Sequence, residues 1–273
     1  MDLNGTVGIL TGASRGIGLY IAETLARKGV NLALAARSAE DLEMTAKKLE
    51  GLGVRTIAVP TDVNKKTDLR SLVKRTSKEL GPIDLLINNA GVEGMVPFVE
   101  MEINHIEQIL NTNLLGLELL TRLVAPGMVQ RRRGHIVNVA SMAGKSAVPY
   151  NTVYLSSKHG LIGFSWSLRA ELRPYGVEVS AVCPTFVSDA GMFTEWRRED
   201  PPSLTKSVTP QAVADATVKA IEKNKAEISV VPGAGKLIDV INAISPDLGS
   251  YLQRRSGLEG YMRKAAERNA RDS

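Results

Sequence analysis

The sequence is poor in cysteine, in aromatic residues and in long apolar runs. Its 273 residues include one cysteine, Cys183, which excludes an intramolecular disulfide framework and any zinc site built from several cysteines. No uninterrupted apolar stretch approaches the roughly 18 to 20 residues that a membrane-spanning helix requires. The first residues, Met1–Gly5, include a charge and no apolar segment, so they do not resemble a secretory signal. These absences predict a soluble, cytoplasmic protein without a transmembrane segment.

The charge pattern also lacks the features of a nucleic-acid-binding protein. The formal net charge of +5 is modest for this length, and aromatic residues make up only 4% of the chain. The densest basic run, Arg131–Arg133, is interpreted as a solvated loop. A nucleic-acid module would combine a basic face with interleaved aromatic residues and a recognisable motif. We therefore expect a small-molecule partner and no nucleic acid.

Short β-branched or aliphatic runs alternate with longer stretches of helical periodicity. The predicted strands are Thr6–Leu10, Asn31–Ala36, Arg55–Pro60, Ile83–Ile87, His135–Ala140, Glu178–Cys183 and Ile228–Val231. The predicted helices are Gly16–Lys28, Ala39–Gly51, Lys66–Leu80, Ile103–Val129, Thr152–Arg173 and Pro210–Lys223. Several strands are almost wholly apolar, as expected for strands that are covered on both faces. The alternation predicts an α/β fold: a single domain with a doubly wound parallel sheet of about seven strands and helices on both faces.

A glycine-rich turn joins the first predicted strand to the first predicted helix. It reads Gly12-Ala13-Ser14-Arg15-Gly16-Ile17-Gly18. Glycines allow the backbone to approach a pyrophosphate closely, and the N-terminus of the helix behind them offers free N–H groups. The spacing differs from the Gly-x-Gly-x-x-Gly fingerprint of dinucleotide-binding folds and lacks the Gly-Lys-Ser/Thr ending of a P-loop. Taken alone, the cluster is also compatible with a tight strand-to-helix turn.

Three further motifs follow the glycine turn along the chain. Asn88-Asn89-Ala90-Gly91 comes after the fourth predicted strand, Ser141 after the fifth, and Tyr154 and Lys158 lie in the helix beyond. In this order and spacing the chain resembles the classical short-chain dehydrogenase/reductase family, from about Leu3 to Gly233. The resemblance implies a Rossmann-type fold, a nicotinamide cofactor, and a homodimer or homotetramer.

The reacting groups are predicted from spacing and from the resemblance. Tyr154 and Lys158 stand four residues apart in a predicted helix, so both side chains project from one face, and the ammonium is expected to lower the pKa of the phenol. The resemblance implies that Tyr154 donates or removes the proton at the substrate oxygen and that Lys158 holds the nicotinamide ribose. Ser141 would hydrogen-bond the substrate oxygen. Asn113 matches the family asparagine that supports a water relay to the lysine; the alternative is an interior polar residue at a helix kink.

The end of the second predicted strand favours NADP(H) over NAD(H). NAD-preferring folds commonly place an acidic residue there, whereas this chain has Ala36 followed by Arg37. Arg37 can pair with a 2′-phosphate, and Arg15 in the glycine turn can meet the same phosphate from the other side. Asp62 and Val63 match the family's adenine-contacting pair, with a plain turn as the alternative. The predicted cofactor contacts are Gly12, Ser14, Arg15, Gly16, Ile17, Gly18, Arg37, Ser38, Asp62, Val63, Asn89, Ala90, Gly91, Tyr154, Lys158, Pro184 and Val187.

Two parts of the predicted cleft need separate mention. Asn88 and Gly91 are expected to shape it. After the sixth strand the family usually continues Pro-Gly and offers a threonine to the nicotinamide carboxamide, but this chain has Thr185 and Asp189 at those positions. Thr185 lacks the easy access of glycine to positive φ, whereas Val187 can still contribute its backbone. These departures affect how the nicotinamide is held, not the predicted reaction class.

We divide the chain into a catalytic domain, residues 1–234, and a C-terminal helical extension, residues 235–273. The substrate loop is placed at about residues 189–209. Its large apolar residues, which form an apolar lid or pack only against the protein, are Met192, Phe193 and Trp196. The extension begins with an apolar stripe that covers the pocket, joins subunits or rests on a membrane surface, and docking on its own chain is favoured.

The sequence therefore predicts an NADPH-dependent short-chain dehydrogenase/reductase that reduces a ketone or other carbonyl, with apolar character, reversibly to an alcohol. The enzyme alternative is a 3-oxoacyl thioester reductase acting on acyl carrier protein or CoA substrates. An alternative of another class is a catalytically silent NADPH-binding sensor or scaffold. No metal is expected, because His105, His135 and His159 share no ligand spacing and are interpreted as structural or surface residues.

Overall fold

Seven parallel strands form the centre of the computed structural model, which describes residues 1–189, 207–232, 241, 244–255 and 257–272. The strands are β1 (Val7–Thr11), β2 (Asn31–Ala36), β3 (Thr56–Pro60), β4 (Leu85–Asn88), β5 (Gly134–Val139), β6 (Val177–Pro184) and β7 (Glu227–Val230). They are arranged in the order β3-β2-β1-β4-β5-β6-β7. Each predicted strand is present, with ends shifted by at most two residues. The predicted fold class is confirmed.

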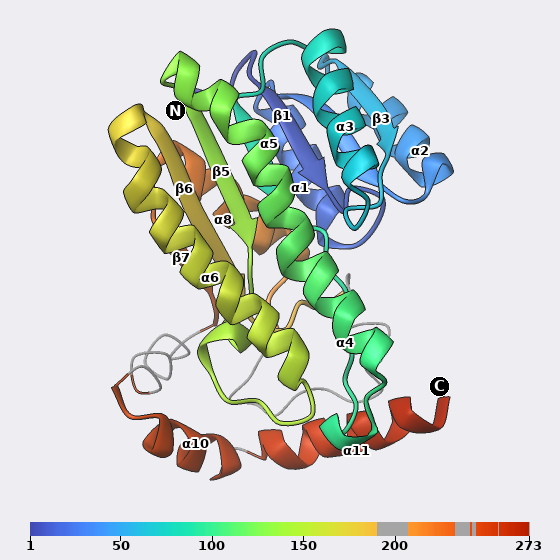
Figure 1. Cartoon of the computed structure of the whole chain (residues 1–273), viewed down its shortest axis with the longest axis vertical. Helices are drawn as coiled ribbons and strands as arrows, with labels where there is room; N and C mark the ends of the chain where they lie inside the picture. The colour runs from blue at the N-terminus through green and yellow to red at the C-terminus, as the bar shows by residue number, and fades with distance from the viewer. Residues whose placement is uncertain (190–206, 233–240, 242–243, 256, 273) are drawn as a thin grey trace.

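Helices cover both faces of the sheet (Figure 1). The helices are α1 (Ile17–Arg27), α2 (Ala39–Glu50), α3 (Lys66–Glu79), α4 (Ile103–Leu110), α5 (Gly116–Arg131), α6 (Thr152–Leu172), α8 (Pro210–Glu222), α10 (Pro246–Arg255) and α11 (Leu258–Asp272). One apolar cluster joins α1, α2 and α8 to the sheet, and a second joins α3, α5 and α6 to its other face. Successive strand residues therefore alternate between two buried layers, as at Ile9 and Leu10, which explains the almost wholly apolar strands.

The strand order reverses at β1, which lies between β2 and β4 in the sheet. From β1 the chain first builds the sheet outward to β3 and then continues on the other side of β1 with β4. In open parallel sheets, ligands bind outside the carboxyl ends of the strands at such a reversal. The arrowheads of β1 and β5 point toward the end of the molecule that carries the N-terminal turn of α6, α10 and α11 (Figure 1). The fold thus assembles the loops after β1, β4, β5 and β6 at one end.

The prediction of one regular helix over Ile103–Val129 is wrong in detail. A π-helical turn, Asn111–Leu115, separates α4 from α5. At the end of this turn, a Cβ on Gly116 would lie 2.6 Å from the carbonyl oxygen of Val63, so only glycine permits the close approach. A π turn inserts one residue into a helix and often lies at a functional site.

The C-terminal helices lie across the carboxyl end of the sheet (Figure 1). Residues Leu258, Tyr261, Met262, Ala265 and Ala266 of α11 are buried with Met95, and Val148, Tyr150 and Phe186 pack against this cluster. The Asn269 Nδ2 also donates to the Met95 carbonyl oxygen at 3.2 Å. Helix α11 is therefore docked on its own chain, whereas residues 237–240 of the predicted apolar stripe lie outside the described residues.

Two smaller sequence predictions concern the basic run at the C-terminal end of α5 and membrane-spanning helices. Arg131–Arg133 end this helix, and the guanidinium groups of Arg131 and Arg133 pair with Asp84 at 3.8 and 3.5 Å. Arg132 and Arg133 follow the end of the helix in an exposed turn, so the predicted solvated loop is largely found, with ion pairs at Arg131 and Arg133. In the described part of the chain, no helix is long and apolar enough to span a bilayer.

Candidate active site

The glycine turn after β1 is built by close backbone packing. Gly12 has a φ of +67°, and a Cβ there would lie 2.8 Å from the Asn89 Nδ2. A Cβ on Gly18 would overlap the carbonyl oxygen of Gly12. Gly16, with φ 61° and ψ −140°, begins α1 without a side-chain cap, in a conformation that is almost restricted to glycine. The first turn of α1 therefore presents backbone N–H groups without a capping side chain, which is the arrangement that binds a pyrophosphate.

Asn89 and Thr11 fasten this turn to the end of β4. The Asn89 Nδ2 donates to the carbonyl oxygens of Thr11 and Gly12 at 3.0 and 3.1 Å. In return, the Thr11 Oγ1 accepts from the backbone N–H groups of Asn89 and Ala90, both at 3.0 Å. The predicted contact residue Asn89 thus also holds the turn in shape. Sequence analysis missed Thr11, although a buried hydroxyl at a strand end is the signal for such a link.

The two arginines predicted to bind a 2′-phosphate follow the carboxyl ends of the adjacent strands β1 and β2. The N–H of Ala13 donates to the carbonyl oxygen of Ala35 at 3.2 Å, and each arginine follows two residues later. Arg15 and Arg37 are both exposed. Ala36, the last residue of β2, supplies no carboxylate. Each of the two strands is therefore followed by an exposed arginine.

The remaining predicted cofactor contacts surround the same end of the sheet. Ser38 accepts from the N–H of Asp41 at 3.4 Å and caps α2. The N–H of Thr61 donates to the Ala36 carbonyl oxygen at 2.8 Å, which places Asp62 next to the end of β2. Val63 is buried, and its carbonyl oxygen faces Gly116 at the start of α5. The half-buried residues of this set at the turn and after β4 are Ser14, Ile17, Ala90 and Gly91.

Ser141 and Tyr154 meet beyond the end of β5. Ser141 begins the short 3-10 helix Met142–Lys145, and its Oγ accepts from the N–H of Ala143 at 3.1 Å. The phenol of Tyr154, which is buried in the first turn of α6, lies close enough to Ser141 for this hydroxyl to lower its pKa. The Ser141 Oγ lies 3.5 Å from the Pro184 carbonyl oxygen, so the end of β6 adjoins the pair.

Lys158 lies one helical turn beyond Tyr154. Its Nζ donates to the carbonyl oxygen of Val139 at 3.0 Å and lies 5.7 Å from the centre of the Tyr154 ring. Burial lowers the pKa of Lys158 to about 8. The structure therefore brings the serine, the phenol and the ammonium together, as the sequence predicts.

The expected effect of Lys158 on the phenol is not found. Burial is the largest influence and raises the pKa of Tyr154, and the carboxylate of Glu93 raises it further. Only the Ser141 hydroxyl acts in the opposite direction and lowers this pKa. Removing the phenol from water disfavours the phenolate more than its neighbours stabilise it. Tyr154 is thus held in its protonated form.

Asn113 lies in the π-helical turn and is fully buried. Its Oδ1 accepts from the Val92 N–H and its Nδ2 donates to the Val92 carbonyl oxygen, both at 2.8 Å. The Nδ2 also donates to the Ser157 Oγ at 3.1 Å. Asn113 therefore clamps the segment after β4 to α6, and the water relay to the lysine stays a prediction.

A family model described as short chain dehydrogenase matches residues 6–201. The chain belongs to the short-chain dehydrogenase family. It is 40% identical over 275 residues to the ketoacyl reductase HetN of Nostoc sp., which covers 99% of this chain and 96% of that protein. It is 35% identical over 213 residues to the oxidoreductase UcpA of Salmonella typhimurium, covering 78% of this chain and 81% of that protein. A variant of the actinorhodin polyketide ketoreductase, crystallised with NADPH, has a TM-score of 0.79 at 32% identity over 84% of this chain and 97% of its own.

In this short-chain dehydrogenase the Asn88 side chain lies in the core and not in the wall of the cleft, where it was predicted. Its buried Nδ2 donates to the Thr121 Oγ1 at 3.0 Å and to the Asn138 Oδ1 at 2.8 Å, between the sheet and α5. Asn138 in turn donates to the Ser165 Oγ of α6 at 2.8 Å. The prediction is wrong for this side chain, because the strand alternation directs it into the helix layer.

The two departures after β6 differ from each other in backbone conformation, and Thr185 behaves as expected for a residue other than glycine. Thr185 is not among the positive-φ residues, and its N–H donates to the Val230 carbonyl oxygen at 3.1 Å. Asp189 adopts the positive φ instead, at 61°. Aspartate tolerates this region better than most residues. Val187 is buried and bridges to Val208, while Met192, Phe193 and Trp196 lie outside the described residues.

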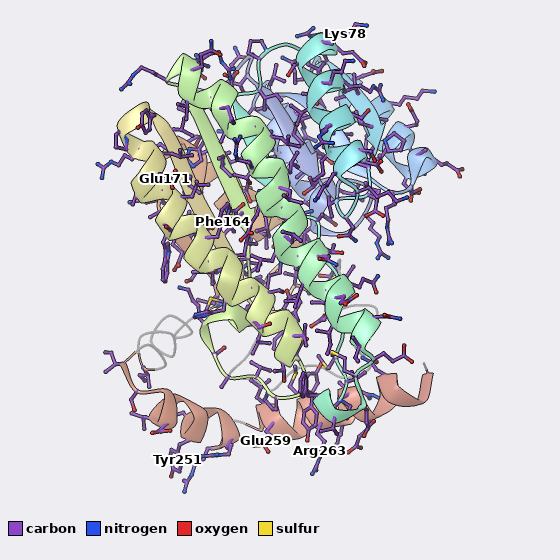
Figure 2. The ribbon with its side chains drawn as sticks, viewed as in Figure 1. Lys78, Phe164, Glu171, Tyr251, Glu259 and Arg263 are labelled. Carbon is purple, nitrogen blue, oxygen red and sulfur yellow. The ribbon has the colours of Figure 1, made fainter. Side chains whose placement is uncertain are left out.

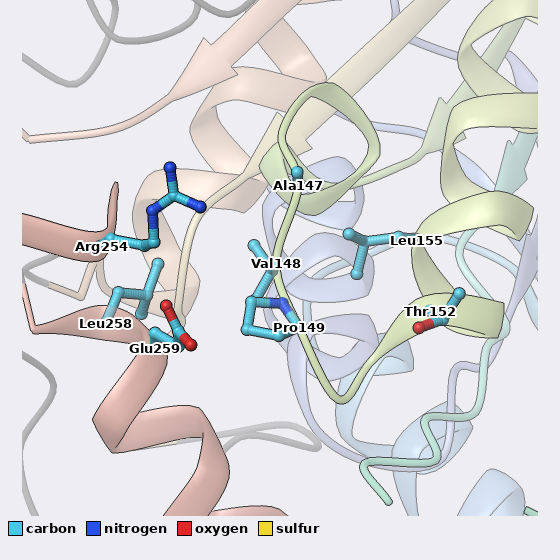
Figure 3. A pocket seen from close by; sticks show the side chains of 8 residues that line it. All are labelled: Ala147, Val148, Pro149, Thr152, Leu155, Arg254, Leu258 and Glu259. Carbon is cyan, nitrogen blue, oxygen red and sulfur yellow. The ribbon is translucent and has the colours of Figure 1, made fainter. Parts of the chain in front are cut away.

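A cavity of about 420 Å³ lies between the loop before α6 and the C-terminal helices (Figure 3). Its lining residues are Ala147, Val148, Pro149, Thr152, Leu155, Arg254, Leu258 and Glu259. Figure 3 shows Arg254, Leu258 and Glu259 on one side and the loop and α6 on the other. The docked extension therefore forms one wall of an apolar cavity near the start of α6.

The histidines are held in different ways. The His135 Nε2 lies 2.8 Å from the Ser180 Oγ, and burial lowers its pKa to about 3. The His159 Nδ1 bonds the Gly144 carbonyl oxygen at 2.8 Å. Among the described residues, no group of three histidine, cysteine or acidic side chains is arranged to hold a metal ion.

Proposed function

We propose that this short-chain dehydrogenase reduces a ketone carbonyl to an alcohol, reversibly, with NADPH. The observation that carries the proposal is the proximity of the Tyr154 phenol, the Ser141 hydroxyl and the Lys158 ammonium at the carboxyl end of the sheet. When bound, the cofactor supplies hydride to the carbonyl carbon. The glycine turn and the uncapped N-terminus of α1 fit its pyrophosphate.

The side chains then handle the oxygen of the substrate. The Ser141 hydroxyl donates a hydrogen bond to it and stabilises the developing negative charge. Tyr154 transfers its phenolic proton to the same oxygen; a phenol carries this proton near neutral pH even at its ordinary pKa of about 10. Lys158, whose Nζ lies 5.7 Å from the centre of the phenol ring, binds the ribose hydroxyls. In the oxidation direction the same groups act in reverse.

We propose NADP(H) as the preferred cofactor because Arg15 and Arg37 flank the end of β2, where Ala36 supplies no carboxylate. Replacing Arg37 by alanine removes one charge-assisted contact to the 2′-phosphate, so NADPH affinity is expected to fall by about tenfold, with little change for NADH. Titration of both cofactors against both proteins measures this. Equal losses for NADPH and NADH would remove Arg37 from the phosphate site.

Two relatives with ketoreductase names favour a 3-oxoacyl thioester as the substrate, within the wider class of apolar ketones. The test is NADPH oxidation with ketones, diketones, steroids and 3-oxoacyl thioesters. Turnover with one of these classes is expected. Tight NADPH binding without turnover of any of them would instead favour a sensor or scaffold.

We further propose a cytoplasmic homodimer or homotetramer. Large apolar side chains are exposed on the long helices, with Leu115 and Leu123 near or on α5 and Trp166 on α6. Such residues are frequent at subunit interfaces. Light scattering of the purified protein gives the mass; a monomer at micromolar concentration would contradict this assembly.

A further inference from the structure

A carboxylate that the proposed reaction does not use stands at the candidate active site. Glu93 follows the segment that Asn113 clamps through both backbone groups of Val92. Two residues earlier, a Cβ built on Gly91 would lie only 3.6 Å from the Lys158 Nζ and 3.3 Å from the Asn113 Oδ1. The backbone that carries Glu93 is therefore fixed against the catalytic lysine.

Asn151 holds the Glu93 side chain from the other direction. It is only 3% exposed and occupies the position before α6, three residues ahead of Tyr154. Its Nδ2 donates to the Glu93 Oε1 at 2.5 Å, whereas its own Oδ1 has no partner among the described residues. The buried amide is thus oriented toward the carboxylate although its oxygen stays unsatisfied. Hydrogen bonds to an ionised acceptor are strong enough to favour this arrangement.

The charge of Glu93 reaches both reacting groups. It raises the pKa of the Tyr154 phenol and also raises that of Lys158, in each case as a Coulombic effect. Both groups are buried, so the interaction passes through a poorly screening interior. A substrate oxygen that bonds Tyr154 is therefore within reach of the Glu93 charge as well as of the Lys158 ammonium.

We propose that Glu93 is a specificity-determining residue, a charge filter that favours 3-oxo esters and thioesters over free 3-oxo acids. This inference rests on the proposed carbonyl reductase function. A free 3-oxo acid carries its carboxylate only two bonds from the reacting carbonyl carbon and is repelled by Glu93. Esterification or thioesterification removes that charge and leaves the reacting carbonyl unchanged.

A purely structural role for Glu93 predicts a different effect of its loss on activity. If the carboxylate only secures the N-terminus of α6 through Asn151, its loss displaces Tyr154 and slows every substrate to the same degree. The ratio of kcat/KM for a neutral substrate to that for its anionic counterpart separates the two roles, because a general loss of activity leaves this ratio unchanged.

The experiment uses the full chain with NADPH, and ethyl acetoacetate and acetoacetate as the matched pair of substrates. For Glu93→Gln, the ester-to-acid ratio of kcat/KM is expected to fall by about tenfold, the order of magnitude for losing one nearby charge interaction. The matched control is Glu171→Gln, which removes the same charge from the other end of α6, about 25 Å along the helix (Figure 2). Its ratio should equal that of the wild type.

Further variants keep the proposal testable if Glu93→Gln does not fold. Glu93→Asp retains the charge and should retain the ratio within about twofold, whereas Glu93→Ala should lower it as Gln does. An unchanged ratio in both uncharged variants overturns the charge filter, and so does an equal loss on both substrates. If the wild type reduces neither this pair nor any other ketone of the panel above, the proposed function fails and the filter with it; turnover with an unchanged ratio overturns the filter alone.

Discussion

Burial shifts the pKa of Tyr154, Lys158 and His135. It raises the pKa of the phenol, lowers that of the lysine to about 8 and lowers that of the histidine to about 3. Water stabilises charged groups better than the protein interior does, so each residue is shifted toward its neutral form. At the candidate active site this makes the phenol a weaker acid. In the core, the lowered pKa of His135 reduces folding stability when the pH falls.

That cost predicts an acid sensitivity that belongs to His135. The unfolded chain binds a proton at this residue below about pH 6.5, whereas the folded chain binds it only near a pKa of about 3. Folding stability must therefore decrease as the pH falls through this window. Relative to pH 7, the contribution of His135 at about pH 4.5 is a loss of roughly 2 to 3 kcal/mol.

Denaturant unfolding of the wild type and of His135→Gln at these two pH values measures the effect. Glutamine retains a hydrogen-bonding group toward Ser180 but does not titrate. The variant is expected to lose less stability on acidification than the wild type. Equal losses would show that His135 is protonated in the folded protein.

The sequence predicts the residues of the site better than their interactions. Ser141, Tyr154 and Lys158 were identified by motif and spacing, and the structure brings them together. The opposing effect of burial on the phenol was not foreseen, because a pKa depends on enclosure by segments that are distant in sequence. For the same reason nothing in the local sequence singled out Glu93 or its partner Asn151, which lie 58 positions apart.

At the scale of elements, glycines determine where backbones approach one another. The turn after β1 needs Gly18 because the carbonyl oxygen of Gly12 occupies the place of a side chain. Gly116 similarly permits the approach of Val63 at the end of the π-helical turn. The sequence predicts the first feature, since glycine clusters mark such turns. It does not predict the π turn, whose extra residue leaves the apolar spacing of the long helix nearly intact.

Gly18→Ala is therefore expected to distort the turn and to weaken both folding and cofactor binding. The added methyl group overlaps backbone, so we expect a loss of about 1 to 3 kcal/mol in unfolding free energy and a marked loss of NADPH affinity. The matched control is Gly163→Ala in α6, where nothing lies within 4 Å of the new methyl group. This control should be neutral or stabilising by up to about 1 kcal/mol. Denaturant unfolding and fluorescence titration with NADPH report both effects; similar behaviour of the two variants would contradict the close packing.

At the scale of the whole molecule, the C-terminal extension completes the end of the sheet where the active site lies. Helix α11 buries Met262 and Tyr261 against Met95 in the loop after β4. Helix α10 differs, since Leu248, Tyr251 and Leu252 stay exposed. The sequence predicts helices in this region and favours docking, but apolar spacing alone does not say which helix is buried.

Met262→Ala tests this docking. Methionine 262 is almost fully buried, so truncating it is expected to lower the unfolding free energy by about 2 to 5 kcal/mol. The control Leu252→Ala, on the exposed part of α10, should change it by less than about 1 kcal/mol. Chemical unfolding of both variants gives the comparison. A Met262→Ala protein as stable as the control would show that α11 is not packed on the core in solution.

The central claim is that the Tyr154 phenol transfers the proton at the substrate oxygen. The most direct measurement is single-turnover reduction by Tyr154→Phe, combined with NADPH titration of the same protein. The variant is expected to keep NADPH affinity within about threefold while its rate of reduction falls by a factor of about 10² to 10⁴. A rate close to that of the wild type, with cofactor binding intact, would contradict the account.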